Sequence, residues 1–150
     1  MIILSDDRNT NYLLGTAAVS IGLIIAICFM FITNLFQNYI WEYQNPINAK
    51  IYNELEKQSE LFCAYDMFNL SEEPNLFEDA KLINLEIIKK YIKQISLEGE
   101  ASLPENLKGY SRSVYCDINR NIIFTEYINY NNDSFISYDG KIYKITDGYW

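Results

Sequence analysis

The chain has 150 residues, with 12 basic and 20 acidic side chains, no histidine and three cysteines, and its formal charge is −8. This charge argues against a nucleic-acid partner, because such proteins usually present a basic face to phosphate. The lack of histidine excludes Ser-His-Asp and Cys-His nucleophilic sites and His-dependent zinc sites. The sequence has no Cys-x-x-Cys pair and no glycine-rich phosphate loop. We therefore expect no catalytic site, no metal and no cofactor.

The chain begins with a short tail, residues 1–11, and continues with residues 12–36, which include no charged side chain. As a helix, the second stretch would be about 37 Å long, which exceeds the roughly 30 Å of a bilayer's hydrocarbon core. We predict a transmembrane helix over 12–36 and an interfacial linker over 37–46. Aromatic side chains gather at the C-terminal exit, as in the interfacial belt of spanning helices: Phe36, Tyr39, Trp41 and Tyr43.

A buried helix of a soluble protein and a cleaved signal peptide are the alternatives for this stretch. A buried helix would show a polar stripe, and a signal peptide has a shorter apolar core, of about 7–15 residues, ending in small residues. The Lys and Arg residues on the two sides are nearly balanced, so they set no orientation. A signal-anchor layout and the cysteines favour the tail inside the cell and residues 47–150 on the extracytoplasmic side of the membrane.

Small residues recur along the apolar stretch at helical spacing. Gly15, Ala18, Gly22 and Ala26 would share one face of a helix. Small side chains let two helices approach closely in lipid. This face is therefore a candidate for association with another helix, although Gly and Ala are common in spanning helices in any case.

Residues 47–150 are predicted to form a soluble α+β domain, in which two helices pack on an antiparallel meander of three or four strands. The first helix is expected over 47–67, with Ile51, Leu55 and Phe62 on its apolar face. The second is expected over 76–97.

Capping signals accompany the second predicted helix. Asn75 can begin it, with Glu78 completing a capping box. Gly99 can end it in a left-handed conformation.

The apolar period changes to two in the last third of the chain. Val114, Cys116 and Ile118 alternate with other residues and should face the core. Asn119-Arg120 is read as a turn. Asp139-Gly140, between two alternating runs, is the strongest hairpin signal in the chain.

Two cysteines lie in the predicted domain. Cys63 and Cys116 could form a disulfide if the domain is in an oxidising compartment. The alternative is two buried free thiols. The third cysteine, Cys28, lies within the apolar stretch.

Tyrosines are numerous, at 13 in the chain, and several fall on predicted strands or strand ends: Tyr127, Tyr130, Tyr138 and Tyr143. Aromatic side chains are favoured at protein interfaces, so these four could form a docking surface on the outer face of the sheet. Cross-strand packing is the alternative explanation.

Residues 37–150, the linker and the domain together, are acidic, because they carry 11 basic and 18 acidic side chains, a formal charge of −7. A domain of this charge should stand off an anionic bilayer.

These observations favour a non-enzymatic, membrane-anchored docking or assembly protein with a protein partner or as a homo-oligomer. The layout of short tail, one span and α+β domain resembles that of T-even-type phage holins, which would imply a role in lysis. A helix followed by a meander also resembles type IV pilin-like subunits, but Thr16 follows Gly15, and Ser20 stands where an acidic residue is needed. A membrane-bound enzyme with paired carboxylates is a further alternative.

Overall fold

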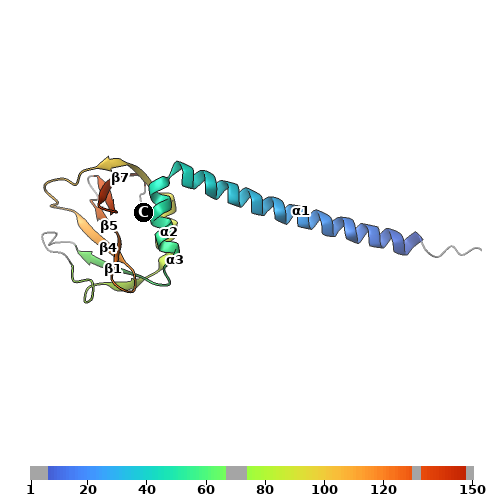
Figure 1. Ribbon diagram of the computed structural model, residues 1–150, viewed down its shortest axis with the longest axis horizontal. Helices are drawn as coiled ribbons and strands as arrows, with labels where there is room; N and C mark the ends of the chain where they lie inside the picture. The colour runs from blue at the N-terminus through green and yellow to red at the C-terminus, as the bar shows by residue number, and fades with distance from the viewer. Residues whose placement is uncertain (1–6, 67–73, 130–132, 148–150) are drawn as a thin grey trace, which may run out of the picture. The chain divides into compact units, whose positions relative to one another are not determined.

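The structure is a computed structural model that describes residues 7–66, 74–129 and 133–147. The chain divides into two compact units, Met1–Tyr43 and Gln44–Trp150. The first unit holds one long helix, and the second holds two shorter helices and a sheet (Figure 1).

The long helix is α1 (Asp7–Gln44). Its segment Thr16–Gln44 is long and apolar enough to cross a membrane, and its most apolar window is not buried in the structure at all. The large apolar side chains from Val19 to Phe36 are 57–68 % exposed. Folding of the chain by itself therefore leaves this apolar surface uncovered.

Two hydroxyl side chains within α1 make their hydrogen bonds inside the helix. Ser20 Oγ donates to the carbonyl of Thr16 at 2.9 Å. Thr33 Oγ1 lies 3.0 Å and 2.9 Å from the carbonyls of Phe29 and Met30, respectively. A hydroxyl bonded in this way can be placed in hydrocarbon without leaving an unpaired donor.

The second unit begins with α2 (Pro46–Glu56), which has proline in its first turn. Proline suits this place because the first amides of a helix have no intrahelical partner. The helix buries Ile51 and Leu55, as predicted. It is shorter than expected, because Phe62 and Cys63 belong to a strand.

The other helix, α3 (Leu85–Gln94), is also shorter than the prediction of 76–97. Asn84 is its N-cap, and the Asn84 side chain accepts from the amides of Glu86 and Ile87. The predicted cap, Asn75, instead makes a local turn, in which its side chain accepts from the Phe77 amide. Gly99 lies within a strand and does not end the helix.

The residues that the structure describes form seven strands, which make one antiparallel sheet in the order β2-β1-β4-β5-β6-β7-β3. The α+β class is confirmed, but the predicted number of strands was too small. β4 to β7 form the expected meander, and the other three strands lie in segments predicted to be helix or loop. The strands are β1 (Leu61–Asp66), β2 (Lys81–Ile83), β3 (Ser96–Ala101), β4 (Ser111–Cys116), β5 (Ile122–Ile128), β6 (Ser134–Tyr138) and β7 (Lys141–Asp147).

Both predicted turns in the meander are present. Asp139 and Gly140 have φ angles of 51° and 72°, and they join β6 to β7 as the Asp-Gly signal predicts. The turn at Asn119-Arg120 joins β4 to β5, with Arg120 at φ 67°. Ile118 lies in this turn and is 57 % exposed, so its predicted place in the core was wrong.

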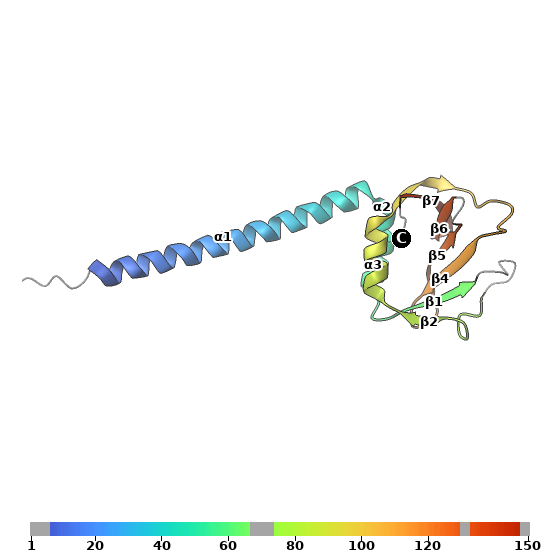
Figure 2. The same ribbon diagram turned by 180° about the vertical axis from the view of Figure 1, so that it is seen from behind.

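The two helices lie side by side on one face of the curved sheet (Figures 1 and 2). Asn48 of α2 links them, because its Nδ2 donates to the carbonyls of Ile92 and Ile95 at 2.8 Å and 2.9 Å. These carbonyls lie at the C-terminal end of α3, where backbone acceptors lack intrahelical partners. The core between helices and sheet consists of Ile51, Leu55, Leu61, Ile88, Tyr91, Ile92, Ile95, Tyr115, Phe124 and Ile136.

Candidate functional site

Among the described residues of the domain, the most buried acidic or basic side chain is that of Glu126, which is 1 % exposed. Tyr91 of α3 donates its hydroxyl to Glu126 Oε1, and Tyr115 of β4 donates to Oε2 at 3.2 Å. Burial raises the pKa of the Glu126 carboxyl, and these two hydrogen bonds lower it in part. The same burial raises the pKa of both tyrosines.

This cluster is a polar element of the core. A substrate could not reach a carboxyl that is 1 % exposed without the domain opening. Its three groups come from α3, β4 and β5, so their hydrogen bonds join the helix layer to the middle of the sheet. Glu126 was not predicted. It lies two residues from both Phe124 and Ile128, so all three share the inward face of the strand. A charged residue in such an apolar pattern was an available signal.

The disulfide expected between Cys63 and Cys116 is not formed, and both cysteines are free. In the register of β1 and β4, Cys63 pairs with Tyr115, whereas Cys116 pairs with Phe62. Successive residues of a strand point to opposite faces of the sheet, so the two Sγ atoms lie on opposite faces. Burial raises the pKa of the Cys63 thiol to about 11. The cysteines therefore give no support to an oxidising compartment.

The four tyrosines predicted to form a docking surface do not share one face. Tyr127 pairs with Phe135 of β6, and Tyr143 pairs with the next residue, Ile136. These two tyrosines therefore lie on opposite faces of the sheet. Tyr143 is buried, at 6 % exposure. Tyr138 is half-buried on the helix-covered face, where it packs against the core, and Tyr130 lies outside the described residues.

A different set of apolar residues crosses the face of the sheet away from the helices. Leu82 of β2 pairs with Phe62 of β1, Phe62 pairs with Cys116 of β4, and Cys116 pairs with Ile122 of β5. Residues paired across strands lie on the same face. We call Leu82, Phe62, Cys116 and Ile122 the apolar row. Leu82 and Ile122 are 60 % and 52 % exposed, whereas Cys116 is fully buried.

One cation lies over the apolar row. The Arg120 guanidinium is 4.0 Å from the centroid of the Phe62 ring, a distance typical of a cation–π contact. Its Nη1 atom is buried and donates no hydrogen bond within the part of the chain that the structure describes. The row thus combines two exposed aliphatic groups with a guanidinium that lies on the Phe62 ring.

The turn between β4 and β5 holds Arg120 in place. The amide of Arg120 donates to the carbonyl of Asp117 at 3.0 Å. The Asp117 carboxylate accepts from the Asn121 amide and from Asn121 Nδ2, both at 2.8 Å. A positive φ is uncommon for a residue with a side chain, and these bonds stabilise the turn in which Arg120 adopts it.

The small-residue face of α1 is open in the structure. A Cβ atom added at Gly22 would meet no other atom within 4 Å, and Ala18 and Ala26 are exposed. The surroundings of Gly15 lie outside the described side chains. Association through this face stays a prediction.

No group of three or more His, Cys, Asp or Glu side chains that could hold a metal ion occurs among the described residues. Scans against protein-family models, curated proteins and solved structures each return no match.

Proposed function

We propose that the chain is a single-pass membrane protein whose small α+β domain docks a protein partner through the apolar row. It acts as an assembly module and not as an enzyme. α1 serves as the anchor, and the domain stands on the extracytoplasmic side. The signal-anchor layout supports that side. The small-residue face of α1 offers a second contact, with another helix in the bilayer.

The exposure of the apolar side chains of α1 is the observation that supports its role as a membrane anchor. Its large apolar side chains from Val19 to Phe36 are 57–68 % exposed, whereas the domain encloses a separate core of its own. Each buried CH₂ group contributes about 0.8 kcal/mol when it leaves water. The apolar helix is long enough to cross the hydrocarbon core of a bilayer, so a bilayer would cover this surface.

The apolar row supports the docking role. The two outer members of the row, Leu82 on β2 and Ile122 on β5, are exposed apolar groups, and exposed apolar surface is typical of protein interaction sites. Arginine and aromatic side chains are enriched among the residues that dominate binding energy at such sites. The partner that fits presents aliphatic side chains to Leu82 and Ile122, which are the exposed members of the row.

Charge-introducing variants test the row. Leu82→Glu and Ile122→Glu should each weaken partner binding by about tenfold or more, because a carboxylate would be desolvated against an apolar group. Both side chains are more than half exposed, so the fold should tolerate the change. The measurement is affinity purification of the full chain from detergent-solubilised membranes of its source cell, with each co-purifying protein quantified.

Ile87→Glu is the matched control, because Ile87 is 55 % exposed on α3, away from the row. It should leave binding unchanged. If all three variants retained the same partner in the same amount, the row would not be the docking surface. Light scattering of the purified chain distinguishes a second copy from a different protein.

A further inference from the structure

The buried Glu126 cluster is built on the same elements that carry the apolar row. Glu126 accepts hydrogen bonds from Tyr91 of α3 and Tyr115 of β4. Tyr115 is followed directly by Cys116, the fully buried member of the row. Successive residues of a strand point to opposite faces of the sheet, so the cluster and the row lie on the two faces of the same strands.

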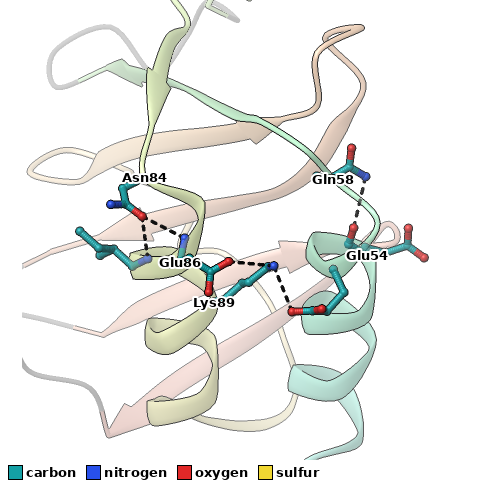
Figure 3. A network of polar contacts seen from close by, with 7 residues as sticks. Glu54, Gln58, Asn84, Glu86 and Lys89 are labelled. Carbon is teal, nitrogen blue, oxygen red and sulfur yellow. Dashed lines mark hydrogen bonds and ion pairs between the residues drawn. The ribbon is translucent and has the colours of Figure 1, made fainter.

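Tyr91 is connected to the exposed edge of the row through a short stretch of chain. A single residue, Asn84, separates β2, which carries Leu82, from α3, which carries Tyr91. The Asn84 side chain accepts hydrogen bonds from two amides in the first turn of α3, at 3.0 Å and 3.3 Å (Figure 3). We call residues 81–94 the β2–α3 segment. Because one capping residue leaves little slack, a shift of α3 displaces β2 and Leu82 with it.

β2 is attached to the sheet by a short ladder. It is an edge strand of three residues, and within the described part of the chain it pairs with β1 alone. The other six strands stay joined without it, in the order β1-β4-β5-β6-β7-β3. Elements with few contacts open at a lower free energy than the core of a domain. The β2–α3 segment can therefore open while most of the sheet remains folded.

The titratable groups that face Glu126 come from three elements. They are Tyr91 of α3, Tyr115 of β4 and the Cys63 thiol of β1, which is paired with Tyr115 and so shares its face. Burial raises the pKa of Cys63 to about 11, and it raises the pKa of both tyrosines above their ordinary value of 10. Glu126 is therefore the member of this set that changes its charge between about pH 5 and about pH 9.

The other elements packed on β5 bring no opposite charge to Glu126. Its neighbour on β6 is Ile136, and α2 presents apolar side chains to the core. On the helices, Lys89 pairs with Glu56 and Glu86 instead, at 3.0 Å in both cases (Figure 3). Among the described residues, no basic side chain pairs with Glu126. Ionisation of Glu126 thus places an unpaired negative charge in the core, which is costly.

We propose that Glu126 is a pH switch for the apolar row, a proposal that rests on the docking function of that row. The protonated carboxyl keeps the β2–α3 segment on the sheet and Leu82 in line with the row. The ionised carboxyl reaches water when α3 moves away, and Leu82 leaves the row with β2. Partner binding is therefore strongest at acidic pH.

The direction of the switch follows from the two forms of the domain. Burial raises the pKa of Glu126 above its ordinary value of 4.5, and the carboxyl regains the ordinary value when the segment opens to water. The open form is therefore increasingly favoured as the pH rises from 4.5 through the raised pKa, by up to about tenfold per pH unit for one proton. Above that pKa the preference is constant.

Amide hydrogen exchange of the full chain in detergent, read by mass spectrometry, tests the switch without any partner. Glu126→Gln has a side chain of the same shape that does not ionise, so it serves as the reference at each pH. In the β2–α3 segment, the ratio of the wild-type rate to the Glu126→Gln rate should rise by up to about tenfold per pH unit above about pH 4.5. The ratio to Glu98→Gln, an exposed position of β3, should stay constant.

The wild-type chain provides a second measurement that does not depend on the variant. Because the opening is local, amides of the β2–α3 segment should exchange about tenfold or more faster than those of β4 and β5 at every pH. Equal exchange in the two regions would mean that the domain opens as a whole, and would overturn the switch. A ratio to Glu126→Gln that does not change with pH would overturn it as well.

Partner capture at about pH 5 and about pH 8 tests whether the switch reaches the row. The wild type should retain severalfold more partner at the lower pH, whereas Glu126→Gln should retain the same amount at both. Equal capture by the wild type at both pH values would overturn the control of docking. Leu82→Glu and Ile122→Glu test docking at a single pH, so failure of the switch and failure of the docking surface give different results.

Discussion

Glu126→Ala is expected to lower the free energy of unfolding of the domain by about 2–4 kcal/mol. The substitution removes the acceptor of two buried hydroxyls, those of Tyr91 and Tyr115, and leaves a cavity in the core. Urea unfolding of the full chain in detergent, followed by pulse proteolysis, measures the change. Glu98→Ala, at an exposed position of β3, is the control and should change stability by less than about 0.5 kcal/mol.

The same carboxyl should make stability depend on pH. Because burial raises the pKa of Glu126 above its ordinary value of 4.5, the folded domain keeps a proton that the unfolded chain has released. The contribution of Glu126 to the free energy of unfolding therefore falls as the pH rises from 4.5 through the raised pKa. Above that pKa the contribution is constant. Glu126→Gln should remove that fall. An unchanged pH profile in this variant, together with a harmless Glu126→Ala, would contradict the role of the cluster.

Asn48→Ala should cost about 2 kcal/mol of unfolding free energy, because two buried carbonyls of α3 lose their donor. Asn48→Asp keeps the shape of the side chain but replaces the donor with an acceptor, so its loss should be at least as large. The same unfolding measurement applies to both. Asn53→Ala, on the exposed side of α2, is the control. If Asn48→Asp were as stable as the wild type, the amide would not be the link between the helices.

Local signals in the sequence predicted the elements that depend on local chemistry. α1 follows from an apolar run without charge, and the β6–β7 hairpin follows from Asp139-Gly140 between alternating residues. Ile51 and Leu55 have the helical spacing of a buried face, and the structure buries both. In each case the deciding information lies within a few residues of the element.

The ends of the helices and the extra strands depend on distant partners. Phe62 and Cys63 fit the apolar spacing of a helix, but they pair with β4, about fifty residues further along the chain. Ser96–Ala101 pairs with β7, equally far away. Propensity alone cannot decide such segments, because their state is set by the neighbouring strand.

The candidate docking surface shows the same limit. The apolar row brings together β1, β2, β4 and β5 through strand register, and a shift of one residue in any strand would remove its member from that face. Register also separates Tyr127 from Tyr143, which the sequence had grouped. The buried Glu126 differs from these residues, because it carried a usable local signal: it is a charged residue in a pattern that faces inward.

Alkaline carbonate extraction of membranes that contain the full chain tests the anchor most directly, with residues 44–150 expressed alone for comparison. Burial of apolar side chains holds a spanning helix in the bilayer, and carbonate does not weaken that burial, whereas it strips proteins that are held by charge. The account predicts the full chain in the membrane pellet and residues 44–150 in the supernatant. Release of the full chain into the supernatant would contradict it.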